Sequence, residues 1–215
     1  QVMSMVFEKH STRTRASFEA GFAQLGGHAI FLDSVATQLG RGETIEDTAR
    51  ALARYSDILM VRTHEHARIE CFAAHSQKPV INGLTNEHHP CQVFADILTY
   101  IEHRGPIAGK TVAWIGDSNN VCRSWLQAAD RLNFTLRIAT PAGYEPKLDA
   151  KPYSSNTLII SHDPKSVVRD ADIVTTDAFT SMGFESQKHQ RLHDFAHYQV
   201  TPALMQLAKS NALFM

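Results

Sequence analysis

The sequence has no long apolar run, and no stretch approaches the roughly 18 apolar residues of a membrane-spanning helix. Its first residues also lack the charged and then apolar pattern of a secretory signal. We therefore expect a soluble protein rather than an integral membrane protein or a secreted precursor.

The sequence also lacks an excess of charge of one sign, because 21 Lys and Arg residues stand against 22 Asp and Glu residues. Nucleic acids and anionic membranes are held largely by a positive field, which this chain does not carry as a whole. We expect neither nucleic acid nor a membrane as a partner. Any anion-binding site must be local.

Cysteine is scarce. Cys71, Cys91 and Cys122 are an odd number without the spacing of a metal site, which favours reduced thiols in a reducing compartment such as the cytoplasm. The twelve histidines supply no H-E-x-x-H motif, so we expect no metal ion.

What the sequence does contain is an alternation of short apolar strands with segments of helical periodicity. Such an alternation predicts an α/β fold of parallel sheets with helices on both faces. A segment with several Gly and Pro residues, 103–109, is the best boundary, so we predict two doubly wound domains, residues 1–103 and 104–215. Within the first domain, Gly83 is predicted to form a turn after a strand at 79–82.

The most informative segment lies between the first strand and the first helix. The strand ends at Phe7, the residues E-K-H-S-T-R-T-R follow at 8–15, and Phe18 and Phe22 then recur at helical spacing. Backbone N–H groups and the positive end of the dipole favour a phosphate or carboxylate at such a helix start. Hydroxyl and guanidinium donors add charge-assisted hydrogen bonds. A helix cap followed by two solvated arginines is the simpler alternative, but the position after a strand favours an anion site.

Further donors occur where other elements begin or end. Arg62 closes the strand at 57–62, on the sheet edge that residues 11–15 also use and where ligands collect in α/β proteins. His89 and Gln92 flank the start of another helix, and a polar loop with Gln38 follows the second strand. A single arginine at a strand end is more often a salt-bridged surface residue than a ligand. We therefore base the prediction of an anion site on Arg62 together with the other donors at this edge, and not on Arg62 alone.

The second half begins with a strand at 110–116, where many α/β proteins bind a dinucleotide. Only Gly116 stands where the G-x-G-x-x-G motif is required, and Thr140-Pro141 replaces the acidic ribose ligand. The sequence therefore fits a fold of the nucleotide-binding type that does not bind a nucleotide better than it fits a dinucleotide-binding domain.

A later loop offers a different site. Asp177 and Ser181 follow the strand at 173–177 and suit an amine ligand, the acid as counter-ion and the hydroxyl as a directing group. An Asp that caps the following turn is about equally compatible with the local pattern.

Taken together, the S-T-R-T-R segment, Arg62, the His-Pro-Cys-Gln motif at 89–92 and the D-A-F-T-S-M-G loop at 177–183 resemble the aspartate/ornithine carbamoyltransferase family. The likeness covers essentially the whole chain. Cys91 and the Ser-Met-Gly sequence are similar to the ornithine branch, because the aspartate branch usually has Thr in place of this Cys and lacks the loop. By this resemblance, the carbamoyl phosphate ligands are Ser11, Thr12, Arg13, Thr14, Gln38, Arg62, His89 and Gln92, and the ornithine ligands are Asn120, Asp177, Ser181 and Met182.

The resemblance implies transfer of a carbamoyl group from carbamoyl phosphate to the δ-amine of L-ornithine, which gives L-citrulline and phosphate in arginine biosynthesis or degradation. Arg13, Arg62 and His89 would be catalytic, because they stabilise charge that develops during transfer. Neither a cofactor nor a covalent intermediate is needed. The first domain would bind carbamoyl phosphate and the second ornithine.

The family also implies a homotrimeric unit in the cytoplasm, or in the mitochondrial matrix of a eukaryote. Its sites form between protomers, so Gln38 would serve a neighbouring subunit. We further expect this chain to be a fragment, because the family's first helix would precede Gln1. A His-Cys-Leu-Pro motif and a later Arg would follow Met215.

Three alternatives remain open. The chain could be a carbamoyltransferase for another amine, such as putrescine or an acylated ornithine, or a catalytically dead homologue that only binds a ligand or partner. A nicotinamide-dependent dehydrogenase is the third, and the weak dinucleotide motif counts against it.

Overall fold

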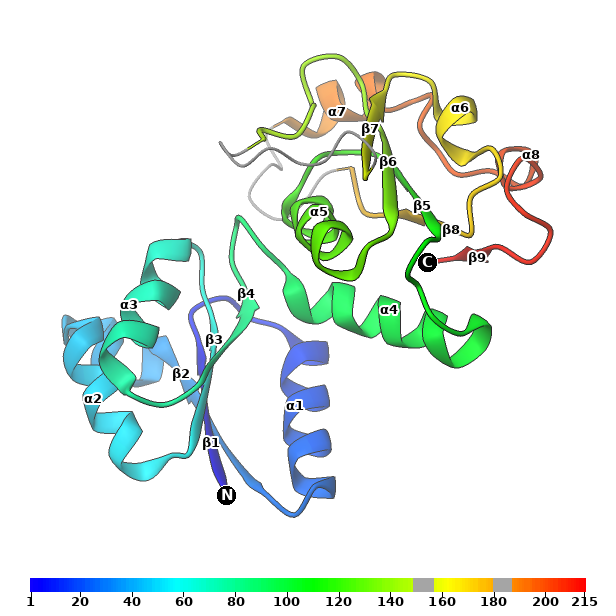
Figure 1. Cartoon of the computed structure of the whole chain (residues 1–215). Helices are drawn as coiled ribbons and strands as arrows, with labels where there is room; N and C mark the ends of the chain where they lie inside the picture. Colours follow the sequence, from blue (N-terminus) through cyan, green and yellow to red (C-terminus); the bar gives the residue numbers. More distant parts are fainter. Residues whose placement is uncertain (149–156, 180–186) are drawn as a thin grey trace. The chain divides into compact units, whose positions relative to one another are not determined.

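The computed structural model describes residues 1–148, 157–179 and 187–215, and the chain divides into two compact units, residues 1–91 and 92–215 (Figure 1). The helix α4 (Pro90–Arg104), which the sequence placed in the first domain, packs in the core of the second unit through Val93 and Ile97. The domain limits 1–103 and 104–215 stay a prediction.

The first unit is a parallel sheet in the order β2-β1-β3-β4. Its elements are β1 (Val2–Phe7), α1 (Thr12–Gln24), β2 (His28–Asp33), two short 3₁₀ turns (Ser34–Ala36 and Gln38–Arg41), α2 (Ile45–Tyr55), β3 (Ile58–Arg62), α3 (His66–Ser76) and β4 (Val80–Leu84). The central strands are apolar and almost fully buried, as expected for a parallel sheet that is covered on both faces.

Helices cover both faces of this sheet. On one face Val6 and Val61 pack against Phe72 of α3 and the apolar side of α2. On the other face Met5 packs with Phe18 and its neighbours on α1. The predicted layering is thus confirmed for the first unit.

The second unit has a parallel sheet in the order β7-β6-β5-β8-β9. After α4 its elements are β5 (Thr111–Ile115), α5 (Asn120–Leu132), β6 (Thr135–Ala139), β7 (Leu158–Ser161), α6 (Pro164–Val168), β8 (Ile173–Thr176), α7 (Lys188–Asp194), α8 (Pro202–Met205) and β9 (Leu213–Phe214). Trp114 of β5 packs with Trp125 of α5 on one face, and Ile115 packs with Val167 of α6 on the other. The α/β fold with parallel sheets is therefore confirmed.

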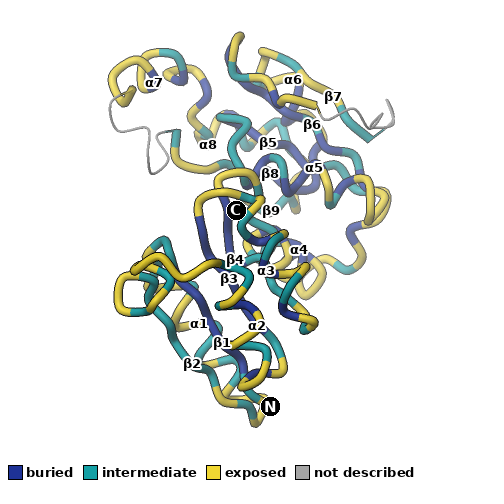
Figure 2. Tube along the Cα trace, turned by 90° about the vertical axis from the view of Figure 1, so that its left-hand side faces the viewer, coloured by how far each residue is buried: buried dark blue, intermediate teal, exposed yellow. Residues whose placement is uncertain are grey.

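In Figure 2 the central strands of each sheet are the buried parts of their units, and the helices are exposed along their outer sides. Among the described residues, no helix has both the length and the apolar character required to cross a membrane.

The prediction of a turn at Gly83 is wrong. Gly83 lies within β4, at a bulge where the pairing with β3 shifts from Val61 with Asn82 to Arg62 with Leu84. A glycine is needed there because of packing, since a Cβ atom would lie 2.5 Å from the Sδ of Met60 and 3.2 Å from the carbonyl oxygen of Val61.

Replacing Gly83 by Ala is expected to lower the stability of the first unit by about 1–3 kcal/mol, the usual effect of adding a methyl group to a filled core. Thermal unfolding measures this loss. Gly21→Ala is the matched control, because nothing lies within 4 Å of a Cβ atom on that residue of α1. The control should be neutral or stabilising, so an equal loss in both variants would contradict the packing explanation.

Candidate active site

The start of α1 is a capped helix N-terminus at the carboxyl end of β1. Ser11 is the cap, and its Oγ accepts a hydrogen bond from the backbone N–H of Thr14 at 3.2 Å and donates to the Oγ1 of Thr14 at 2.9 Å. The first N–H groups of a helix have no partner within the helix, so they are directed outward as donors. The sequence prediction of a helix start at Ser11 to Thr14 is confirmed.

Arg62 joins this helix start to the neighbouring strands. Its guanidinium donates to the Oγ1 of Thr14 at 3.4 Å, to the carbonyl oxygen of Lys9 at 3.2 Å and to that of Gly83 at 3.5 Å. Only 6% of Arg62 is exposed, and burial lowers the pKa of its guanidinium. The described contacts include no carboxylate at Arg62, so this buried positive charge is available to an anion at the start of α1.

Arg13 and Arg15 lie on the same helix but differ in their surroundings. Thr12 and Arg13 are exposed on the first turn. Arg15 instead interacts with residues of its own unit. Its guanidinium lies 3.7 Å from the centre of the Phe31 ring, and its Nε donates to the Oε1 of Glu19 at 3.0 Å. The sequence suggested both Arg13 and Arg15 as donors to an anion. In the structure only Arg13, of these two, has an exposed guanidinium that is not used in a described contact within the unit.

The sequence did not reveal the partner of Glu8. Arg68 on α3 donates to the Glu8 carboxylate from one edge of its guanidinium, with Nε at 2.9 Å from Oε2 and Nη2 at Oε1. The hydroxyl of Thr63 donates to the same carboxylate. The hydrogen bonds that Arg68 donates to Glu8 raise the pKa of the Arg68 guanidinium. The negative charge of Glu8, just before the capped start of α1, is thus neutralised by a residue that is distant in the sequence.

Replacing Arg68 by Ala is expected to raise the KM for an anionic substrate severalfold and to lower stability by about 1–3 kcal/mol, because it leaves a half-buried carboxylate without its cation. Initial rates and thermal unfolding measure the two effects. Adding Glu8→Gln to Arg68→Ala removes the uncompensated charge. A double variant that recovers no affinity would contradict this electrostatic role.

The His-Pro-Cys-Gln motif forms the turn into α4. His89 is partly buried directly before the helix, and the buried hydroxyl of Thr85 accepts hydrogen bonds from the N–H groups of Glu87 and His88, which fixes the turn. The thiol of Cys91 donates to the carbonyl oxygen of Asn82 at 3.3 Å, and burial raises its pKa. Cys91 is therefore a packing residue rather than a nucleophile.

Gln92, in the first turn of α4, donates from Nε2 to the Oδ1 of Asp96 at 2.8 Å. Its side-chain oxygen is thereby directed away from Asp96. Burial raises the pKa of Asp96, and the negative charge of Asp177 adds to this rise. Gln92 and Asp96 are one helical turn apart, a spacing at which such pairs form readily.

Gln38 lies on the 3₁₀ turn after β2. Its side chain is exposed, whereas the next residue, Leu39, packs into the core of the first unit. A small, mainly apolar cavity of about 160 Å³ lies beneath this loop and is lined by Val6, Leu32 and Leu52 among others.

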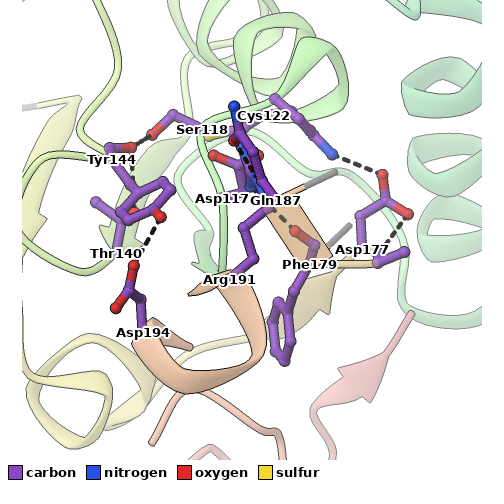
Figure 3. Close-up of polar contacts among 12 residues, drawn as sticks. Asp117, Ser118, Cys122, Thr140, Tyr144, Asp177, Phe179, Gln187, Arg191 and Asp194 are labelled. Atoms are coloured by element: carbon purple, nitrogen blue, oxygen red, sulfur yellow. Dashed lines mark hydrogen bonds and ion pairs between the residues drawn. The ribbon is translucent and has the colours of Figure 1, made fainter. Parts of the chain in front are cut away.

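In the second unit two loops at the carboxyl edge of the sheet are joined by side chains (Figure 3). Asn119 caps α5, and its Nδ2 donates to the Oδ2 of Asp177 at 2.7 Å. The other oxygen of Asp177 accepts from the backbone N–H of Ala178 at 2.7 Å. Asn120 is the first residue of α5. Asn120 and Asp177, which the family resemblance implies as ligands of one substrate, are therefore brought together by Asn119, which precedes Asn120 and bonds to Asp177. The prediction omitted Asn119.

A buried ion pair supports the same loops. Arg191 of α7 donates from Nη1 to the Oδ2 of Asp117 at 2.8 Å and to the carbonyl oxygen of Phe179 at 3.0 Å. The Arg191 and Asp117 side chains are 6% and 13% exposed. Tyr144 lies over the same guanidinium, 5.2 Å from its carbon. Sequence reasoning missed this clamp because its partners come from three distant segments.

Two predicted ligands, Ser181 and Met182, lie outside the described residues. Within the residues that are described, no group of three or more His, Cys, Asp or Glu side chains could hold a metal ion.

Comparison with known proteins decides the family. The model for the aspartate/ornithine carbamoyltransferase carbamoyl-P binding domain matches residues 1–102, and that for the Asp/Orn binding domain matches residues 108–215. The chain belongs to the aspartate/ornithine carbamoyltransferase family. An ornithine carbamoyltransferase of Chromobacterium violaceum is 63% identical over 216 residues, covering all of this chain and 70% of that relative.

Solved structures of carbamoyltransferases share the fold. The ornithine carbamoyltransferase from Burkholderia thailandensis has a TM-score of 0.88 at 50% identity, and that from Pyrococcus furiosus has a TM-score of 0.91 at 43% identity. Each comparison covers the whole of this chain, and 70% and 71% of the solved chains, respectively.

Proposed function

We propose that this carbamoyltransferase transfers the carbamoyl group of carbamoyl phosphate to the δ-amine of L-ornithine, giving L-citrulline and phosphate. Identity of 63% and 56% to proteins named ornithine carbamoyltransferase supports this substrate. The single structural observation that carries the proposal is the buried Arg62, which presents its charge beside the capped start of α1.

Carbamoyl phosphate binds in the first unit with its phosphate at the start of α1. Backbone N–H groups of the first turn, the Arg13 guanidinium and Arg62 supply donors and positive charge. The hydroxyl groups of the same turn are the remaining donors to the phosphate. The proposed ligands are Ser11, Thr12, Arg13, Thr14, Arg62, His89 and Gln92. The hydrogen bond from Nε2 of Gln92 to Asp96 fixes the orientation of the Gln92 side-chain amide. Its side-chain oxygen, Oε1, can then accept a hydrogen bond from the carbamoyl NH₂ group.

Ornithine binds in the second unit at the two bridged loops. Asp177 accepts the α-ammonium group, Asn120 donates to the α-carboxylate, and Ser181 and Met182 complete the site. This arrangement holds the α-amino acid end and leaves the δ-amine as the attacking group. The acceptor must be the neutral amine, because an ammonium group has no free electron pair.

Transfer then follows from charge stabilisation. The δ-nitrogen forms a bond to the carbamoyl carbon, the carbonyl oxygen becomes negative, and the bond to the phosphate oxygen breaks while the amine loses a proton. Arg13, Arg62 and His89 are the catalytic groups, since preorganised donors are worth most where charge develops. Holding both substrates in place supplies the proximity contribution.

The assembly and location are also proposed. The protein forms a homotrimer in the cytoplasm and serves arginine metabolism, with the exposed Gln38 reaching the carbamoyl phosphate site of a neighbouring protomer. The three free cysteines fit a reducing compartment. Sedimentation measures the mass of the assembly, and a monomer with full activity would contradict the role of Gln38.

A panel of amines tests the substrate. With carbamoyl phosphate in excess, L-ornithine should give citrulline and an equal amount of phosphate, whereas aspartate should not react. Putrescine lacks the α-amino acid end, so it should react far more slowly. Equal rates with putrescine would favour a carbamoyltransferase for another amine, and binding without turnover would favour the catalytically dead homologue.

A further inference from the structure

The side chain of Asn119 uses both ends of its amide group. Its Oδ1 accepts hydrogen bonds from the backbone N–H groups of Val121 and Cys122, at 3.0 and 3.1 Å. Its Nδ2 donates to the Oδ2 of Asp177 at 2.7 Å. One residue thus caps α5 and contacts the carboxylate that follows β8.

These contacts fix the orientation of the amide. If the group were flipped, its NH₂ would face two backbone N–H donors and its oxygen would face a carboxylate, so every contact would be lost. Because Oδ1 is held by the helix, Nδ2 must point at Asp177. The second oxygen of Asp177 is held by the N–H of Ala178. Both oxygens keep further lone pairs, so the carboxylate remains able to accept from a ligand.

We propose that Asn119 is a positioning residue for ornithine: it holds the Asp177 carboxylate in one orientation for the α-ammonium group. This inference rests on the proposed function of Asp177. Asn119 itself does not contact the substrate.

Helix capping alone does not require this residue. Asn, Asp and Ser cap helices about equally well. Of these three, only Asn combines an acceptor for the helix with an N–H donor for Asp177. The choice of Asn therefore reflects the contact with Asp177 as well as the cap.

The test is Asn119→Ser, which keeps a cap and removes the side-chain NH₂ group that donates to Asp177. The KM for ornithine should rise by about tenfold or more, as expected for a lost hydrogen bond to a charged group. The KM for carbamoyl phosphate should stay within about twofold, because none of its proposed ligands is Asn119 or Asp177 and all of them except Gln92 lie in the first unit. The kcat with both substrates saturating should change much less than the KM for ornithine, because Asn119 orients a ligand and does not react. A purely structural residue would not separate the KM for ornithine from the other kinetic constants.

Asp163 provides a matched control. It caps α6 by the same pattern, with its two oxygens accepting from the N–H groups of Lys165 and Ser166 at 3.0 and 3.2 Å. Asp163→Ala should lower the melting temperature and leave both KM values unchanged. Asn119→Thr is a second variant in case Ser disturbs the loop, and thermal unfolding checks that each variant folds.

An ornithine KM that rises no more in the Asn119 variants than in Asp163→Ala, or an equal rise for both substrates, would overturn the inference. Failure of the proposed function looks different. In that case the unaltered protein would form no citrulline, and the inference would fall with it. An unaltered protein that forms citrulline, together with variants that keep its ornithine KM, refutes only the role of Asn119.

Discussion

Replacing Arg13 by Ala is expected to lower kcat/KM for carbamoyl phosphate by about 30-fold to several thousandfold, equivalent to about 2–5 kcal/mol of transition-state stabilisation. The reason is that Arg13 presents a positive charge on the first turn of α1, which is the proposed site of the phosphate and of the charge that develops on it. Its side chain is exposed, so the variant should fold and melt like the unaltered protein. Initial rates at varied carbamoyl phosphate measure the effect.

Arg15→Ala is the matched control for this prediction. It removes the same group two residues along the same helix, but the Arg15 guanidinium lies over Phe31 and beside Glu19. The control should change stability slightly and leave kcat/KM nearly unaltered. Equal kinetic losses in both variants would point to a general loss of positive charge rather than to a specific phosphate ligand.

Replacing Asp177 by Asn is expected to have the second largest effect, on ornithine alone. The change keeps the shape of the side chain and removes the negative charge, so the KM for ornithine should rise by about tenfold to several hundredfold, a loss of about 1.5–3 kcal/mol or more. Equilibrium binding of carbamoyl phosphate should be nearly unchanged, because all of its proposed ligands except Gln92 lie in the first unit and Asp177 is not among them. Calorimetric titration with each substrate separates the two effects.

A control for Asp177→Asn is Asp170→Asn, at a carboxylate of the same unit that is not among the predicted ligands. This variant should leave both affinities unchanged. If Asp177→Asn weakened carbamoyl phosphate as much as ornithine, the assignment of Asp177 to the amine site would be wrong. The same conclusion would follow if putrescine were carbamoylated as well as ornithine.

The fold could be predicted from the sequence because its signals are local. The apolar runs that end at Phe7 and Arg62 are strands because each is buried on both faces of a parallel sheet. The helix start at Ser11 could be predicted from its cap, and the cap at Thr44 from the same logic, since its Oγ1 accepts from the N–H of Asp47. The family resemblance supplied the ligand roles, which remain predictions.

What the sequence could not provide are the contacts between distant segments. Glu8 and Arg68 are 60 residues apart, and Asp117 and Arg191 are 74 apart, so no local pattern pairs them. The wrong prediction of a turn at Gly83 has a related cause, because the requirement for glycine there comes from packing against another strand. A glycine after a strand suggests a turn, but here it is required by the nearby Met60 and Val61.

Two contacts of the candidate site lay within reach of sequence reasoning. Gln92 and Asp96 have the spacing of neighbours on a helix face, and their hydrogen bond follows from it. Asn119 stands directly before α5, in the position where Asn is a preferred cap. The cap was predictable, but its bond to Asp177 was not, because it depends on the pairing of β5 with β8.

The most direct test of the central claim is an isotope experiment on the transferred group. Carbamoyl phosphate labelled with ¹³C at the carbonyl and L-ornithine labelled with ¹⁵N at the δ-amine are incubated with the protein and followed by NMR. We expect citrulline in which ¹³C is coupled directly to ¹⁵N, with one phosphate released for each coupled product. Product without this coupling, or carbamoyl phosphate that turns over at the same rate without ornithine, would contradict the central claim.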